Sequence, residues 1–273
     1  MWMSLVAASA LTACSAALPD DRSSVAATTV SVASTVSVGP TSTVATTSAV
    51  TSPATGHVPP RVVLVGDSLA LEAAPHLPAL LPGQAFEHHT FGGTAPCDWL
   101  EADIGYTDDS VVVFSFLGNA SSACMAPTGQ MPRGDEIVER YGADVTALVA
   151  AAIAAGALVV LLGQPPVSPD NVDGNALVVL LNELYAELAR APNVSFVDAG
   201  AALESEQGAF AERLPCRADE PECGADGLVV VRSDDGVHFC PGTYVSPCPT
   251  YSSGAVRFAE AIAVAAHDPA RFD

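Results

Sequence analysis

The stretch Arg61-Val62-Val63-Leu64-Val65-Gly66-Asp67-Ser68-Leu69 decides the fold class of this 273-residue chain. Its apolar residues run together without polar alternation, which is typical of a strand buried on both faces of a parallel sheet. Gly66 permits a tight turn, and residues 70–74 suit a helix. Ser68 is therefore expected where a strand ends and a helix begins, the place at which open α/β sheets bind their ligands.

Short apolar runs and helical periodicity alternate through the rest of the chain. The segment 145–169 carries no charge and is long enough to cross a bilayer, but Gly156 and Pro165-Pro166 interrupt it, so we interpret it as a packed helix followed by a central strand. Further buried strands are predicted at 111–116, 157–162 and 194–197, a weaker one at 85–91, and helices at 135–155, 175–190 and 252–266. This pattern predicts a doubly wound α/β/α domain with a parallel sheet covered on both faces.

The region before the domain has the character of an export segment and a spacer. Residues 1–13 are uncharged and mostly apolar, which predicts a signal peptide, and Leu11-Thr12-Ala13-Cys14 resembles the lipobox that directs lipidation of a cysteine. No Lys or Arg precedes the apolar run, which leaves two alternatives: a true start further upstream, or Cys14 as an ordinary small residue. Residues 14–60 are dominated by Ser, Thr, Ala and Val and predict a disordered tether, with a glycosylated stalk as the alternative. The folded domain is expected over residues 61–273.

Six cysteines remain in the expected domain, and we predict that they form disulfides. Their number is even, none forms a C-x-x-C pair, and the export signal places them where disulfides persist. Sequence proximity favours Cys97 with Cys124, Cys216 with Cys223, and Cys240 with Cys248, although other pairings stay open. We expect the protein outside the cytoplasm, held to the membrane by a lipid on Cys14, or secreted if that cysteine is not modified.

The charge excludes several classes of partner. Ten Lys and Arg residues against 31 Asp and Glu residues give a formal net charge of -21. Such a surface repels phosphate backbones and anionic lipid head groups, so we expect no nucleic-acid binding and no membrane contact beyond the lipid anchor. Apart from His238, the histidines lack the spacing of a ligand set, and we expect no metal and no cofactor. We also expect a monomer.

A second motif, Asp235-Gly236-Val237-His238, lies between a strand-like run at 228–231 and the final helix. A serine hydroxyl is a weak nucleophile, and histidine, with an unperturbed pKa of about 6.5, can take and return its proton near neutrality. A carboxylate then fixes the imidazole tautomer. Asp235 is placed to do this within one turn, and Asp234 is an alternative. The simpler interpretation is an acidic turn with an incidental histidine.

Two loops offer donors for an oxygen that becomes negative during acyl transfer. Phe91-Gly92-Gly93-Thr94 follows the weak strand, and its glycines let a backbone N–H approach a substrate closely. Leu117-Gly118-Asn119 follows the strand at 111–116, where the amide of Asn119 would reach the same oxygen. Ordinary turns are the alternative for both loops, and a plain helix N-cap is the alternative for Ser68.

The four motifs G-D-S-L, G, G-N and D-x-x-H, in this order, resemble the blocks that define the SGNH (GDSL-like) hydrolases, and they spread over nearly all of residues 61–273. The resemblance implies a flavodoxin-like three-layer α/β/α fold. It also implies that Ser68 is the nucleophile, that His238 is the base, and that Asp235 orients the imidazole.

The resemblance further implies an oxyanion hole made by the N–H groups of Ser68 and Gly92 and the side chain of Asn119. Gly92 is favoured over Gly93 because the second block of the family usually reads G-x-S/T, as Gly92-Gly93-Thr94 does. Ala120 departs from the pattern, because many esterases of this type have Asp after the Asn. The substrates of those enzymes are therefore not carried over.

Residues 92–99 and 235–241 resemble actinobacterial cell-envelope SGNH proteins and the SGNH domains of some membrane acyltransferases, which carry cysteines beside the catalytic loops. This implies that the bridges of Cys97 and Cys240 brace the oxyanion loop and the histidine loop. We therefore expect an exported serine esterase whose partner is an ester-bearing small molecule, or an O-acylated envelope glycan or lipid. An O-acyltransferase with the same residues is one alternative, and a glycan-binding protein without turnover is another.

Overall fold

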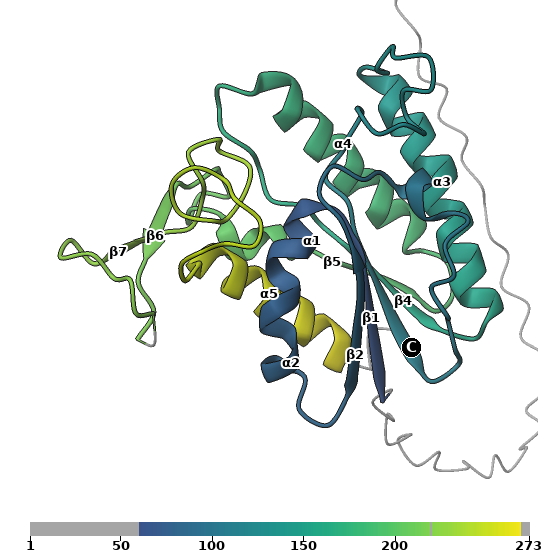
Figure 1. Ribbon diagram of the computed structural model, residues 1–273, viewed down its shortest axis with the longest axis horizontal. Helices are drawn as coiled ribbons and strands as arrows, with labels where there is room; N and C mark the ends of the chain where they lie inside the picture. Colours follow the sequence, from purple (N-terminus) through teal and green to yellow (C-terminus); the bar gives the residue numbers. More distant parts are fainter. Residues whose placement is uncertain (1–59, 219, 269–273) are drawn as a thin grey trace, which may run out of the picture. The chain divides into compact units, whose positions relative to one another are not determined.

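A computed structural model describes residues 60–218 and 220–268. The expected signal peptide, Cys14 and all of the tether except residue 60 lie outside the described residues. The domain is built on a five-stranded parallel sheet with the strand order β2-β1-β3-β4-β5 (Figure 1). Its strands are β1 (Arg61–Gly66), β2 (Ala85–Thr90), β3 (Ser110–Ser115), β4 (Leu158–Leu162) and β5 (Val194–Val197).

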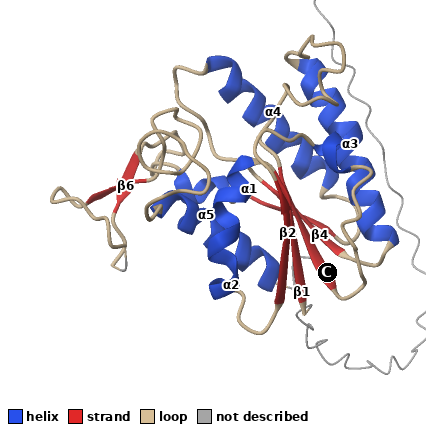
Figure 2. Cartoon of the chain, viewed as in Figure 1, coloured by secondary structure: helices blue, strands red, loops and turns tan. Residues whose placement is uncertain are grey.

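Helices cover both faces of this sheet, as Figures 1 and 2 show. One face packs against α1 (Ser68–Ala73), α2 (Leu77–Leu80) and α5 (Ser253–His267), and the other against α3 (Asp135–Ala154) and α4 (Val172–Leu188). Three short 3-10 helices lie in the connections: η1 (Ala74–His76), η2 (Pro96–Trp99) and η3 (Gly200–Leu203). The predicted doubly wound three-layer fold is confirmed, and its strand order is the flavodoxin-like one.

The central strand β1 explains how the sequence specifies these layers. Val62 and Leu64 pack into the core on the α5 side, and Val63 and Val65 into the core on the α3 side, because successive side chains of a strand point to opposite faces. All four are fully buried, and each contributes about 1.5–3 kcal/mol of hydrophobic stabilisation. The chain pairs β1 first with β2 and then with β3, so the order reverses at β1 and opens a crevice at its carboxyl end.

Two strands depart from this buried pattern. All side chains of the edge strand β2 are exposed or half-buried, which explains the weak apolar signal at 85–91. The run predicted at 228–231 forms β7 (Leu228–Val230), but it pairs antiparallel with β6 (Arg213–Pro215) in a separate two-stranded sheet. Within β7 only Val229 is buried, which is too little apolar surface for a strand of the main sheet.

The charge-free segment 145–169 folds as the second part of α3, then β4 and a loop. Gly156 separates helix and strand with a φ of 87°, and a Cβ at this position would lie 2.8 Å from Cβ of Asp108, so the turn requires glycine. Among the described residues, no helix is long and apolar enough to cross a membrane.

Three disulfides join the pairs favoured by sequence proximity: Cys97–Cys124, Cys216–Cys223 and Cys240–Cys248. The first bridge ties η2 to the loop before α3 and spans 27 residues of sequence. In the chain-entropy model, closing a loop of this length stabilises the folded state by about 3.5 kcal/mol. Disulfides in this number are typical of extracellular or exported proteins.

Candidate active site

Gly66 and Asp67 place Ser68 at the junction of β1 and α1. A Cβ on Gly66 would lie 2.4 Å from the carbonyl oxygen of Ser115, so only glycine fits between β3 and the start of the helix. Asp67 is the N-cap of α1, and its carboxylate accepts the backbone N–H of Leu69 at 3.1 Å. Ser68 is consequently the first helical residue, at the carboxyl end of β1.

Ser68, His238 and Asp235 form a hydrogen-bonded line, although 170 residues separate the serine from the histidine. Nε2 of His238 lies 2.9 Å from Oγ of Ser68, and Nδ1 lies 2.6 Å from Oδ2 of Asp235. In the tautomer whose Nδ1–H donates to Asp235, Nε2 accepts the serine hydroxyl. An imidazole in this position is able to take the serine proton while the carboxylate stabilises the charge that it gains.

The second oxygen of Asp235 fixes the turn that carries the histidine. Oδ1 accepts the backbone N–H groups of Val237 at 2.9 Å and His238 at 3.0 Å. Partial burial raises the pKa of Asp235, but the hydrogen bond from the imidazole and these two N–H bonds outweigh it, so the pKa lies below its usual value. The carboxylate on the imidazole is thus that of Asp235 and not that of the alternative, Asp234.

A buried carboxylate, Glu72, ties the histidine loop to α1. Glu72 lies one helical turn after Ser68 and accepts the backbone N–H groups of Phe239 at 2.9 Å and Cys240 at 3.0 Å. Burial raises its pKa above the usual value, although these two hydrogen bonds act in the opposite direction. No motif in the sequence singles out Glu72 as a functional residue. Its single local signal is the four-residue spacing from Ser68, which puts both side chains on one helix face.

Gly92 is the glycine nearer to Ser68. A Cβ on Gly92 would lie 3.9 Å from Cβ of Ser68, whereas one on Gly93 would have no atom within 4 Å. Gly93 has a φ of 80°, so the turn itself favours glycine there. Within residues 60–218 and 220–268, the backbone N–H groups of Ser68 and Gly92 donate to no protein acceptor. Both are therefore free to donate to an oxygen bound beside the serine.

The side chain of Asn119 reaches the same region, but the protein itself holds it. Nδ2 donates to Oδ2 of Asp67 at 3.2 Å and to the carbonyl oxygen of Thr94 at 3.0 Å. Both N–H bonds are engaged, so donation to a substrate oxygen requires Asn119 to share or release one of them. The carbonyl of Asn119 accepts the hydroxyl of Tyr141 at 3.1 Å, which fixes this loop from behind.

Asp67 joins these loops, a role that the sequence analysis did not assign. Its side chain is fully buried, and Oδ2 accepts the backbone N–H of Leu117 at 2.7 Å as well as the amide of Asn119. Burial raises the pKa of Asp67 to about 6, although the N–H groups of Leu117 and Leu69 lower it. One carboxylate thus links β1, the start of α1 and the loop after β3.

An aromatic ring covers the imidazole. The Tyr244 ring stacks on that of His238 with a centroid distance of 3.6 Å and an interplanar angle of 15°. Tyr244 belongs to the loop that Cys240 and Cys248 close. Tyr244 was not predicted as a site residue, because no local pattern relates a tyrosine in a disulfide loop to the histidine before that loop.

A cavity of about 150 Å³ lies beside Asn119, and its other walls are mostly apolar. Val237, the residue directly before His238, forms part of the wall. A larger groove of about 440 Å³ shares Gly174 and Leu177 with it. The lining of the smaller cavity is Leu117, Gly118, Asn119, Val167, Asn171, Gly174, Leu177, Val178 and Val237.

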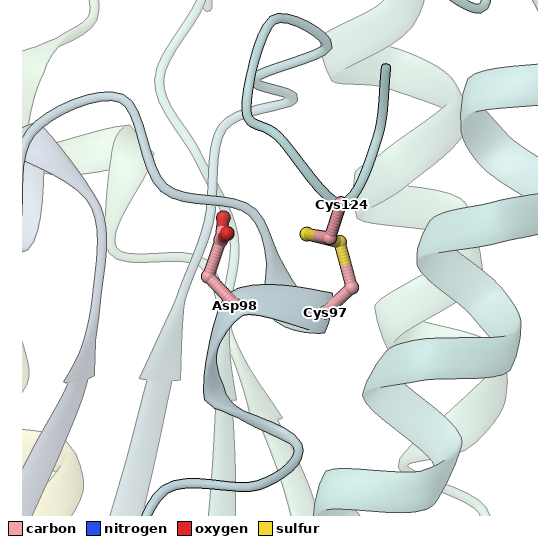
Figure 3. Close-up of side chains that lie close together, drawn as sticks. All are labelled: Cys97, Asp98 and Cys124. Atoms are coloured by element: carbon pink, nitrogen blue, oxygen red, sulfur yellow. A yellow bond between two sulfur atoms is a disulfide. The ribbon is translucent and has the colours of Figure 1, made fainter. Parts of the chain in front are cut away.

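Cys97, Asp98 and Cys124 are the one group of close-lying potential metal ligands in the described part of the chain (Figure 3). The two sulfur atoms are bonded to each other, and the Asp98 carboxylate accepts the backbone N–H of Ala95 at 2.8 Å. A disulfide offers no thiolate to a metal. The disulfide joins the loop that follows Gly92 to the loop before α3, and the bracing role expected for Cys97 stays a prediction.

Comparisons with known proteins agree with this architecture. The family model described as "Protein of unknown function (DUF459)" matches residues 98–244, and no curated protein matches the chain. A Streptococcus pneumoniae structure provisionally described as a platelet activating factor is 16% identical, with a TM-score of 0.50 over 76% of this chain and 84% of that chain.

Two further structures are similar. The C-terminal catalytic domain of peptidoglycan O-acetyltransferase A from Streptococcus pneumoniae is 21% identical, with a TM-score of 0.47 over 77% of this chain and 93% of that chain. A Bacteroides fragilis protein provisionally described as an acylhydrolase is 19% identical, with a TM-score of 0.48 over 76% and 86%. At such identities the likeness concerns the fold, and the expected SGNH hydrolase fold is confirmed.

Proposed function

Because the chain belongs to the DUF459 family and has the SGNH hydrolase fold, we propose that it is a serine hydrolase acting on carboxylic esters through an acyl-Ser68 intermediate. The observation that carries this proposal is the contact of 2.9 Å between Oγ of Ser68 and Nε2 of His238, with Asp235 on the far side of the ring. The alternative of Ser68 as a plain helix N-cap does not hold, because Asp67 caps α1, and capping would not align an imidazole and a carboxylate from a distant loop on this hydroxyl.

The reaction follows from this geometry. Oγ of Ser68 attacks the ester carbonyl carbon as its proton passes to Nε2 of His238, and the carbonyl oxygen becomes negative. The carbon–oxygen bond to the alcohol then breaks, and the imidazolium returns the proton to the departing alcohol oxygen. Water, or another hydroxyl, attacks the acyl-serine with His238 again as base, and Ser68 is regenerated.

The oxyanion is expected to bind to the N–H groups of Ser68 and Gly92, which have no acceptor among the described residues. Each donor of this kind is worth about 3–4 kcal/mol of transition-state stabilisation in well-studied cases. We propose Asn119 as the third donor, which would release or share its bond to Thr94.

The acyl group is proposed to occupy the cavity beside Asn119 and Val237. A volume of about 150 Å³ corresponds to about five water-sized groups, which suits a short acyl chain such as acetyl or butyryl. An O-acyl group on an envelope glycan or lipid fits this size and the exported location that the disulfides suggest. We further propose that a lipid on Cys14 holds the enzyme at the membrane.

Labelling with a fluorophosphonate tests the nucleophile. We expect the wild type to be labelled, and Ser68→Ala and His238→Ala to lose labelling together with hydrolysis of acetyl esters. A wild type that neither reacts with the probe nor cleaves acetyl, butyryl or longer esters would overturn the proposal and leave a binding protein on a hydrolase scaffold.

Product analysis separates an esterase from a transferase. With an acetyl ester as donor and a soluble glycan as acceptor, free acetate identifies water as the acceptor, and acetylated glycan identifies a sugar hydroxyl. Ser68→Ala is the control for both products. We expect free acetate as the main product. If acetyl transfer to the glycan predominates, the protein is an acyltransferase and not an esterase.

A further inference from the structure

The loop Cys240–Cys248, here called the strap, has a fixed beginning. Cys240 is fully buried, its N–H donates to Glu72 at 3.0 Å, and its carbonyl accepts the hydroxyl of Ser233 at 2.5 Å. The residue before it is held as well, because the carbonyl of Phe239 accepts the hydroxyl of Ser252 at 2.7 Å. The disulfide to Cys248 therefore ties the far end of the strap to a rigid point.

Between the two cysteines the strap has little packing of its own. Gly242, Thr243, Val245 and Ser246 are exposed, and Val245 shows 50% of its surface to solvent. Tyr244, midway along the strap, is half-buried: its ring lies flat on His238, and its phenol oxygen approaches Gly92, where a Cβ would lie 3.7 Å away. The strap thus extends from the histidine loop toward the proposed oxyanion loop and brings one aromatic side chain to both.

The stacking geometry favours one charge state of the imidazole. Parallel rings with close centroids are the least favourable arrangement for two neutral aromatic groups, because their quadrupoles repel. A cation over the face of an aromatic ring is attracted instead. With a centroid distance of 3.6 Å and an interplanar angle of 15°, the Tyr244 ring therefore interacts more favourably with imidazolium than with neutral imidazole. The charged groups that act on Tyr244 are Glu72, Asp235 and Asp67, and Arg232 donates to the carbonyl of Val237, next to His238.

We propose that Tyr244 is a positioning residue for acyl transfer: the strap holds its ring on His238, and the ring stabilises the imidazolium that forms when Ser68 loses its proton. This inference rests on the proposed function, because only a histidine that accepts the serine proton becomes cationic at this step. The contribution grows as the proton moves, so it belongs to the transition state more than to the bound substrate.

Three variants measured on an acetyl ester test the ring. Tyr244→Leu keeps an apolar cover but removes the π face, and we expect kcat per titrated active site to fall about ten-fold with KM changed less than two-fold. Tyr244→Phe keeps the face and should restore kcat to within two-fold of the wild type. Val245→Ala, the neighbouring exposed residue, is the matched control and should match the wild type.

Two outcomes would overturn the role of the ring. A Tyr244→Leu enzyme with wild-type kcat per active site would do so, even if its thermal stability were lower. A Tyr244→Phe enzyme as slow as Tyr244→Leu would also do so, because the phenol and not the ring face would then matter. If the wild type itself lacks esterase activity and probe labelling, the proposed function fails, and this inference fails with it.

The role of the strap is tested by releasing its far end. Cys248→Ala should lower kcat about as much as Tyr244→Leu, and the double variant should be no slower than either single variant, since both changes remove the same contact. Multiplied losses in the double variant, or a Cys248→Ala enzyme with wild-type kcat, would show that the disulfide does not hold the ring in place.

Discussion

Glu72, one helical turn after Ser68, accepts a hydrogen bond of 2.9 Å from the backbone N–H of Phe239, the residue that follows His238. The helix that begins with the proposed nucleophile therefore holds the loop that carries the proposed base. The position of His238 relative to Ser68 is therefore fixed by this buried carboxylate in addition to the direct contact between the two side chains.

Replacing Glu72 should loosen the histidine loop. Glu72→Ala leaves two buried N–H groups without an acceptor, and we expect the free energy of unfolding to fall by about 3 kcal/mol and probe labelling of Ser68 to slow. Glu72→Gln keeps one acceptor oxygen and should lose about 1 kcal/mol. Urea denaturation measures both, with the exposed Glu183→Ala as control. Equal stability of Glu72→Ala and the wild type would contradict the role of this carboxylate.

The buried Asp67 should make stability depend on pH. Its folded pKa of about 6 lies above the ordinary value of 3.8, so the folded state favours the protonated form. The stability that this preference contributes is complete below pH 3.8 and is lost as the pH rises through 6, a change of about 3 kcal/mol. The Asn side chain of the Asp67→Asn variant does not titrate in this pH range.

Comparing Asp67→Asn with the wild type isolates this carboxylate, because the other ionisable groups are common to both proteins. Urea denaturation between pH 3.5 and 7.5 should show the wild type losing about 3 kcal/mol relative to the variant over this range. A constant difference between the two proteins across the range would contradict the raised pKa.

Neighbouring aspartates should differ sharply in their effect on rate. Asp235→Asn removes the charge that orients and stabilises His238, and we expect kcat to fall on the order of 10³–10⁴-fold. Asp234→Asn should change kcat less than two-fold, because Nδ1–H of His238 donates to Asp235 and not to Asp234. Steady-state kinetics on an acetyl ester measures both. A larger loss in Asp234→Asn than in Asp235→Asn would reassign the orienting carboxylate.

The cavity beside Asn119 should set the acyl-chain preference. Leu177 lines both this cavity and the larger groove, and Leu177→Ala, which enlarges the space between them, should raise kcat/KM for octanoyl relative to acetyl esters about ten-fold. Leu180→Ala, which changes the larger groove alone, is the matched control. If the wild type already prefers long chains, or Leu177→Ala leaves the ratio unchanged, the acyl group binds elsewhere.

The proposed lipid on Cys14 is tested by fractionating cells that produce the full chain. Mass analysis of the membrane fraction should find a lipid on Cys14, and Cys14→Ser should move the protein from the membrane fraction to the soluble one. A wild type that is soluble and unmodified at Cys14 would contradict the proposed anchor and favour a secreted protein instead.

The local patterns of the sequence determined most of the scaffold. Unbroken apolar runs gave β1, β3 and β4 because strands buried on both faces need no polar alternation, and spacing of three to four residues gave α3, α4 and α5. The turn from Asp235 to His238 is equally local, since a carboxylate three residues before an imidazole reaches it within one loop. The disulfide pairs were also predicted, because each joins cysteines close in sequence.

Only the tertiary structure decided which of these elements meet. Three features depend on contacts between segments that no sequence periodicity relates. β7 lies outside the main sheet, Glu72 holds the loop after His238, and Tyr244 covers the imidazole. Asp67 illustrates the reason. Its residue type is typical of a helix N-cap, but its burial and its hydrogen bonds to Leu117 and Asn119 exist only once β1 and β3 lie side by side. Short-range patterns encode the backbone, whereas the chemistry of a buried side chain is set by its neighbours in space.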